Sequence, residues 1–153
     1  MPISLDLKQK LFILCKDFVE NSIATLQQAM DDSQLAANAD EKGSAGDKHE
    51  TGRAMMHLEK EKNAKQLAER LKLREVISML NPDEELNSGQ LGSLIKTDSA
   101  VYYLSIPMGK VELDGNEYLV ISPVSPIGQV LLSKKKGDTF VFNGRESKVE
   151  NVV

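Results

Sequence analysis

A short acidic motif, Gly46-Asp47-Lys48-His49-Glu50, combines residue types that can do chemistry. Asp47 and Glu50 are three residues apart, a spacing that brings two side chains to one side of a helix. One interpretation is a capping box, with Asp47 as the N-cap residue and Glu50 reaching back to it. The other is a pair of carboxylates that shares a divalent cation. Because Mg²⁺ keeps much of its water and needs further ligands, such a pair would work only by completing a site that a partner supplies.

The net charge of the 153-residue chain is −4, and all of it comes from one segment. Residues 31–50 carry six acidic and two basic side chains, whereas acidic and basic residues balance over the rest of the chain. This balance argues against a free-standing DNA-binding protein, since such proteins usually present a basic face.

The apolar residues and the cysteine content indicate a cytoplasmic protein. The longest apolar run near the start, Leu11–Cys15, is five residues, too short for a signal peptide or a membrane span. The single cysteine argues against an internal disulfide and a multi-cysteine metal site, and fits a reducing compartment. We therefore expect no membrane contact.

The first half of the chain predicts two long helices. In the first, apolar residues recur at spacings of 3, 4, 4, 3 and 4, at Phe12, Cys15, Val19, Ile23, Leu26 and Met30. The second has a comparable set, Ala64, Leu67, Leu71, Leu73, Val76 and Leu80. Because the polar segment Asn38–Gly46 separates them, we expect a long antiparallel coiled-coil hairpin over residues 1–81, with its tip at about 38–50. The acidic pair then lies at the far end of the hairpin.

The composition changes near residue 81, where Asn81-Pro82 ends the second helix. Residues 82–93 are polar and are expected to form a linker. Residues 94–153 contain strand and turn patterns and are expected to form a second domain.

This second domain is predicted to be a small antiparallel sheet with one short helix. The expected strands are Ala100–Ile106, Lys110–Leu113, Glu117–Ser122, Thr139–Phe142 and Ser147–Val152. Two hairpins are expected, one around Asp114-Gly115 and one with a turn widened to Asn143–Glu146. Ser125 suits an N-cap and Pro126 the first helical position, so the short helix begins there. The fold class is therefore α+β.

The order of these elements and one long run of residues resemble the bacterial Gre transcript-cleavage factors (GreA/GreB). The run Ile121–Asp138 contains Ser-Pro-Ile-Gly, a Leu-Leu pair, a Lys pair and Gly-Asp in the order seen in that family. The hairpin with Gly-Asp-x-x-Glu at its tip is similar to the family's N-terminal coiled coil. The second half resembles its FKBP-like C-terminal domain.

The resemblance implies a function in transcription. The coiled coil would enter the secondary channel of RNA polymerase, where Asp47 and Glu50 help to hold a Mg²⁺ ion shared with the polymerase active site and its attacking water. The polymerase would then hydrolyse the 3′ end of the backtracked nascent RNA. The factor would stimulate this cleavage, have no catalytic residue of its own, bind no cofactor tightly when isolated, and be a monomer.

Further residues are candidates for contacts with the polymerase or the RNA. The C-terminal domain would grip the channel entrance, and its candidate contact residues are Ser125, Pro126, Ile127, Gly128, Lys134, Lys135 and Lys136. Arg53 is a candidate for lying near RNA phosphates. The alternative for the lysines is a solvated loop, and for Arg53 an ordinary charged helix face.

Three other functions remain open from the sequence. The first is a regulator that binds the secondary channel without stimulating cleavage. The second is an FKBP-like protein-binding module or prolyl isomerase. The scarcity of aromatic rings argues against a proline pocket, since this half of the chain has only Tyr102, Tyr103, Tyr118, Phe140 and Phe142. The third is an enzyme that uses Cys15 as a nucleophile; since this residue lies on the apolar stripe, a buried packing role is expected instead.

Overall fold

The computed structural model describes residues 2–41 and 46–153, and for residues 37, 40, 41 and 46–51 it describes the backbone alone. The chain divides into two compact units, Asp17–Glu75 and the combination of Met1–Lys16 with Val76–Val153. Two long helices, α1 (Leu5–Glu41) and α2 (Gly46–Ser78), contribute residues to both units. Across the described ranges, none of the helices combines the length and the apolar character needed to cross a lipid bilayer.

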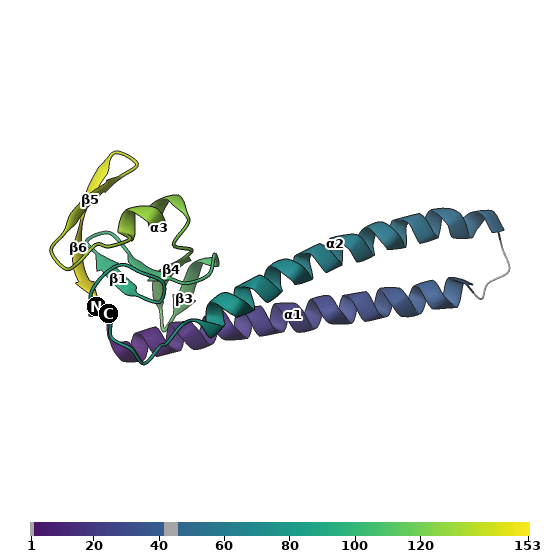
Figure 1. Ribbon diagram of the computed structural model, residues 1–153, viewed down its shortest axis with the longest axis horizontal. Coiled ribbons are helices and arrows are strands. Elements are labelled where there is room, and N and C mark those ends of the chain that lie inside the picture. Colours follow the sequence, from purple (N-terminus) through teal and green to yellow (C-terminus); the bar gives the residue numbers. More distant parts are fainter. Residues whose placement is uncertain (1, 42–45) are drawn as a thin grey trace. The chain divides into compact units, whose positions relative to one another are not determined.

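The unit Asp17–Glu75 is the predicted helical hairpin, in which α1 and α2 run side by side (Figure 1). Val19 and Ile23 are buried, as the apolar stripe of the first helix predicts. Helix α2 ends at Ser78, shortly before the predicted boundary at Asn81-Pro82. The predicted turn residues 42–45 lie outside the described part of the chain.

The stripe predicted for the second helix is partly wrong, because Ala64 and Leu71 are exposed. The half-buried positions lie one residue earlier, at Asn63 and Arg70. The guanidinium carbon of Arg70 lies 5.2 Å from the centre of the Phe18 ring, so a cation over an aromatic face takes the place of an aliphatic contact. A search for apolar residues alone therefore misses the polar residues on the inner face of this helix, although Leu67, Leu73, Val76 and Leu80 are half-buried as predicted.

The second unit contains the predicted short helix, α3 (Pro126–Leu131), and a sheet that has six strands in place of the expected five. The strands are β1 (Leu94–Thr97), β2 (Val101–Leu104), β3 (Gly109–Leu113), β4 (Asn116–Ile121), β5 (Thr139–Phe142) and β6 (Arg145–Val152). Their order in the sheet is β3-β4-β2-β1-β6-β5. The sheet is mixed rather than wholly antiparallel, because β4 lies between β3 and β2 and pairs in parallel with β2.

Two local predictions for this sheet need correction. Strand β1 was not expected, since the predicted sheet began at Ala100; a four-residue strand with Leu94 and Ile95 fully buried shows no clear alternation of apolar and polar residues. Arg145 and Glu146 do not widen a turn, because they pair with Phe142 and Val141 on β5. The turn is therefore the two-residue Asn143-Gly144.

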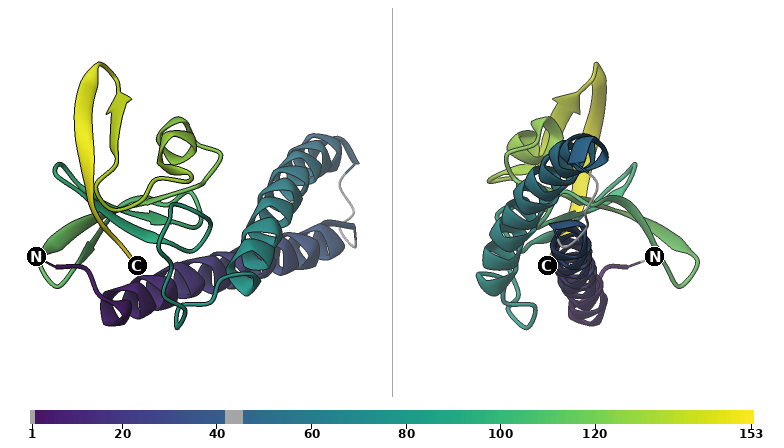
Figure 2. Two further views of the ribbon diagram at one scale, coloured as in Figure 1. Left: turned by 60° about the vertical axis from the view of Figure 1, so that its left-hand side comes forward. Right: turned by 90° about the vertical axis from the view of Figure 1, so that its right-hand side faces the viewer.

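Helix α3 packs against the β5–β6 end of the sheet (Figure 2). The buried cluster there comprises Ile95, Leu104, Leu131, Phe140 and Val149. The segment expected as a linker, residues 82–93, makes backbone hydrogen bonds to this unit, from Gly92 to the Leu104 carbonyl at 2.7 Å and from Gly89 to the Lys134 carbonyl at 2.8 Å. These bonds tie the segment to both the sheet and the loop after α3.

Candidate functional site

The predicted acidic pair lies at the beginning of α2. Since this helix begins at Gly46, one residue before the expected N-cap, Asp47 lies in its first turn and Glu50 begins the second. Their side chains are outside the described residues, so capping and metal binding both stay predictions. The first turn of a helix favours carboxylates in either case, because free backbone N–H groups and the helix dipole make it electropositive.

Side-chain contacts between the two helices set the register of the hairpin. Arg74 donates from Nε and Nη2 to the two carboxylate oxygens of Glu20, at 2.9 and 2.8 Å. Further along, Lys60 Nζ donates to Gln34 Oε1 at 2.8 Å. The partner on α1 has a higher residue number where the partner on α2 has a lower one, so the two helices are antiparallel. Gly46 therefore lies at the end of the hairpin opposite Glu20 and Arg74.

Arg53, the candidate for lying near RNA, is exposed on α2 about two turns after Gly46. His57 and Lys60 follow it at spacings of four and three residues, which places the three side chains on one face of the helix. Lys60 on this face already donates to Gln34 on α1, and RNA binding by Arg53 stays a prediction.

The candidate residues Ser125–Gly128 form a well-ordered turn at the start of α3. Ser125 Oγ donates to the Ser122 carbonyl at 2.6 Å and accepts from the Gly128 amide at 3.1 Å, so it is the predicted N-cap. A Cβ atom at Gly128 would lie 2.1 Å from the Ser122 carbonyl oxygen, which excludes any side chain there. Ile127 packs against the buried cluster and holds the turn in place, whereas Pro126 is exposed to solvent on its outer side.

The three candidate lysines follow the C-terminal end of α3. Lys135 and Lys136 are exposed and Lys134 is half-buried. The Lys135 amide donates to Asp138 Oδ2 at 2.8 Å, which orders the loop. A six-residue helix is only about 9 Å long, so the structure places the two predicted groups at the two ends of one short element.

Lys8 is a buried charged residue that the sequence analysis did not single out. Its Nζ atom donates to the carbonyl oxygens of Glu84 at 2.7 Å and Val153 at 3.2 Å. Burial lowers the pKa of Lys8 from its usual value, and the negative charges of Glu84 and Glu85 oppose this effect. The signal in the sequence was its position seven residues before Cys15, which places it on the same helix face.

Cys15 has the predicted packing role. The residue is fully buried, and its Sγ atom lies 3.7 Å from Ser105 Oγ. Burial raises the pKa of the Cys15 thiol to about 11. The thiol is therefore protonated at neutral pH and inaccessible, two properties that do not suit a nucleophile.

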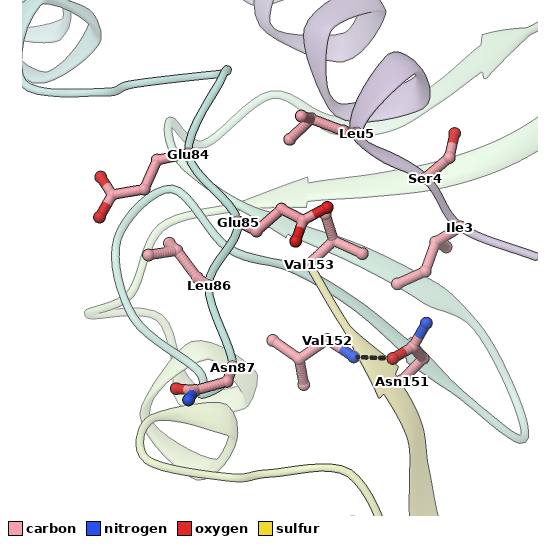
Figure 3. A pocket seen from close by; sticks show the side chains of 10 residues that line it. All are labelled: Ile3, Ser4, Leu5, Glu84, Glu85, Leu86, Asn87, Asn151, Val152 and Val153. Atoms are coloured by element: carbon pink, nitrogen blue, oxygen red, sulfur yellow. Dashed lines mark hydrogen bonds between the residues drawn. The ribbon is translucent and has the colours of Figure 1, made fainter.

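A cavity of about 860 Å³ opens beside the first residues of α1 (Figure 3). Its walls come from Ile3–Leu5, Glu84–Asn87 and the end of β6, and Figure 3 shows the Asn151 side chain accepting a hydrogen bond from the Val152 amide at 2.9 Å. The lining mixes carboxylates, amides and scattered aliphatic side chains. Here and elsewhere among the described side chains, no three His, Cys, Asp or Glu residues come together as a possible metal site.

A second cavity, of about 340 Å³, lies where α3 meets β2 and β5. The cavity is lined by three of the five aromatic residues of this unit, Tyr102, Phe140 and Phe142. Ile127 and Arg145 also line it. The scarcity of rings therefore does not prevent an aromatic pocket, because strands distant in sequence bring the few rings together.

Comparisons with known proteins find similarity at the level of structure only. No protein-family model matches the chain, and no curated protein matches it. A crystal structure of Thermus aquaticus Gfh1 matches with 17% identity and a TM-score of 0.34, over 89% of this chain and 92% of that chain. A structure of the transcription factor Gfh1 matches with 19% identity and a TM-score of 0.34, over 92% of each chain. Matches at this TM-score do not establish a function.

Proposed function

We propose that this protein is a Gre-type transcription factor that binds RNA polymerase through the secondary channel and stimulates cleavage of backtracked RNA. The observation that carries the proposal is the helical hairpin in which α2 begins at Gly46 and contains Asp47 and Glu50 among its first five residues. Support comes from the run Ile121–Asp138, which resembles the Gre factors in sequence and folds into an ordered turn, a short helix and a lysine loop.

The donor set at the hairpin tip suits Mg²⁺, which prefers carboxylate oxygens. Asp47 and Glu50 would supply part of its coordination shell, and the polymerase would supply the rest. Asp47 and Glu50 would hold this ion together with its attacking water, and the polymerase's own metal would stabilise the leaving oxygen. The role of this chain is to carry the two carboxylates at the end of a helix about 50 Å long, narrow enough to enter a channel.

The second unit would contact the rim of the channel. Pro126, Lys135 and Lys136 are exposed at the two ends of α3 and offer an apolar and a basic contact. In this proposal the protein is not itself an enzyme, because the polymerase carries out the hydrolysis. Its place of action is then the cytoplasm.

A regulator that occupies the channel without stimulating cleavage is the second candidate. The feature that favours it is Lys48, which stands between the two acidic residues in the sequence and would bring a positive charge that opposes a cation there. The two candidates share the binding step and differ only in the use of the acidic pair.

The test is an RNA cleavage assay on polymerase complexes stalled in a backtracked state. We expect the protein to accelerate cleavage, and the double variant Asp47→Ala/Glu50→Ala to lose at least about tenfold of this effect while co-sedimenting with polymerase as before. Asp31→Ala/Asp32→Ala, which removes two acids from the same acidic segment, is the matched control and should retain the activity.

Each other outcome contradicts part of the proposal. A double variant as active as the wild type would show that the acidic pair does not act in cleavage. Binding without acceleration by the wild type would favour the regulator. A failure to co-sediment with polymerase would contradict both candidates.

A further inference from the structure

The sheet of the second unit has an open edge at β3. Strand β3 (Gly109–Leu113) lies at the end of the sheet opposite β5, and in the described part of the chain it pairs with β4 alone (Figure 1). The two strands are joined by the turn Asp114-Gly115, in which both residues have positive φ. A two-residue turn of this type makes Leu113 and Asn116 a hydrogen-bonded pair, which fixes the hydrogen-bonding pattern along the strand.

This pattern decides which backbone groups of β3 are free to pair with another strand. Hydrogen-bonded and non-hydrogen-bonded pairs alternate in an antiparallel ladder, so Leu113, Val111 and Gly109 direct their N–H and C=O groups to β4. The N–H and C=O groups of Lys110 and Glu112 therefore point to the open edge. A strand edge with such groups can pair with a further strand.

The side chains at this edge carry opposite charges. Lys110 and Glu112 are exposed and, being two residues apart, lie on the same face of the sheet. Glu117 on β4 lies directly opposite Glu112, and two like charges in this position destabilise the pairing. Lys110 Nζ lies 3.1 Å from Glu117 Oε1, in an ion pair whose side chains are 63% and 65% exposed. A second cation next to Glu112 would therefore stabilise the edge.

The charge pattern of β3 is complementary to itself. When two copies of β3 pair in antiparallel directions about a two-fold axis at Val111, Lys110 of each copy lies opposite Glu112 of the other. Because both positions face outward, each of these pairs exchanges both of its backbone hydrogen bonds. Opposite charges across an antiparallel ladder stabilise it, and the lysine of the second copy also offsets the repulsion between Glu112 and Glu117. A parallel pairing in register would instead bring like charges together.

The other edge of the sheet does not offer this complementarity. On β5 the outward positions are Thr139 and Val141, because Phe142 and Arg145 close the two-residue turn before β6. The same two-fold pairing there would place threonine opposite valine and would form no ion pair. Charge complementarity therefore favours β3 for association of the chain with itself.

We propose that this protein forms a symmetric dimer in which β3 pairs with β3 of a second copy of the chain. Backbone hydrogen bonds and two Lys110–Glu112 ion pairs hold the copies together and extend the sheet across both. A strand of five residues buries little surface, so the dimer is weak, and the monomer implied by the resemblance to Gre factors is the main species at low concentration. Helix α3 packs at the β5–β6 end of the sheet, so the dimer leaves the candidate polymerase contacts free and does not depend on the proposed function.

The test is sedimentation equilibrium of the full chain from about 10 µM to about 1 mM, where an interface of this size should show a monomer–dimer equilibrium. Lys110→Glu should weaken the dimer by at least about tenfold, because the two-fold axis places the new carboxylate opposite Glu112 at both ends of the interface. The double variant Lys110→Glu/Glu112→Lys restores opposite charges in the same register, so it should recover the association. Val141→Lys is the matched control, since it adds a charge to the other edge strand, where this side chain is 63% exposed, and should leave the dimer unchanged.

Hydrogen exchange of the wild type locates the interface without any substitution. The amides of Lys110 and Glu112 should exchange more slowly as the protein concentration rises, whereas those of Thr139 and Val141 on the edge of β5 should not change. Circular dichroism checks that the variants, whose substituted side chains are exposed, keep the fold. The proposal is overturned if the chain is monomeric at the highest concentration, if Lys110→Glu associates as strongly as the wild type, or if the double variant does not recover the association. Protection of the β5 amides in place of those on β3 would overturn it as well.

Discussion

The two units of this protein are stabilised in different ways. Within Asp17–Glu75, the buried hydrophobic residues among the described side chains are Val19 and Ile23 alone. The sheet unit instead contains a contiguous buried cluster around Leu104 and Leu131. The stability of the hairpin therefore depends on helix propensity and on exposed contacts such as Arg74–Glu20. The stability of the sheet unit depends on close packing.

The largest expected effect comes from a cavity in the core of the sheet unit. Leu104 is fully buried, so Leu104→Ala should lower the free energy of unfolding of this unit by about 2–5 kcal/mol. Leu58→Ala on the hairpin, where the side chain is 66% exposed, is the control and should change it by less than about 0.5 kcal/mol. Urea unfolding followed by tyrosine fluorescence reports on the sheet unit, because Tyr102, Tyr103 and Tyr118 all lie there, and circular dichroism of the same samples reports on the helical hairpin. Equal effects of the two variants would contradict the contrast between the units.

Replacing a glycine by alanine should change the free energy of unfolding in opposite directions in the two units. Gly128→Ala in the sheet unit should cost about 1–3 kcal/mol, since the new Cβ would clash with the Ser122 carbonyl. Gly52→Ala in the hairpin should gain about 0.5–1 kcal/mol, because nothing lies within 4 Å of its Cβ position and alanine favours a helix. Thermal unfolding followed by circular dichroism measures both changes. If Gly52→Ala destabilised the protein, this part of α2 would not be an open helix surface.

The smallest effect at neutral pH is expected for Lys8→Met, and its signature is the pH dependence. The substitution removes a buried charge and leaves the Glu84 carbonyl without this donor, whereas the Val153 carbonyl still accepts from the Leu94 amide at 2.9 Å. The net change should therefore be within about 1 kcal/mol. The pKa of Lys8 is lowered from 10.5 in the folded state, so the unfolded state binds more protons between the lowered pKa and 10.5. The wild type should therefore gain stability relative to Lys8→Met as the pH rises through that window. Urea midpoints of both proteins at several pH values measure this difference, and a flat difference would show that Lys8 is not desolvated.

The candidate site was only partly predictable from the sequence. The turn at Ser125 was predicted because an N-cap followed by proline is a local signal, and the structure confirms its hydrogen bond to Gly128. The short distance between this turn and the lysine loop followed from the length of α3. The pocket around Phe142 and Arg145 was missed, because the scarcity of rings was counted along the chain and not by position in the sheet.

The elements whose signals are local follow from the amino-acid sequence. Spacings of three and four residues specified the helices, and Pro82 placed the end of the second one within a few residues of Ser78. Asp114-Gly115 specified a tight turn with positive φ at both residues, whereas the turn at Asn143-Gly144 was expected to extend to Glu146. Only the tertiary structure decided the strand β1, the parallel pairing of β2 with β4, and the burial of Lys8. These features depend on contacts between residues far apart in the chain, and the side chains of one segment carry no information about which distant segment will cover them.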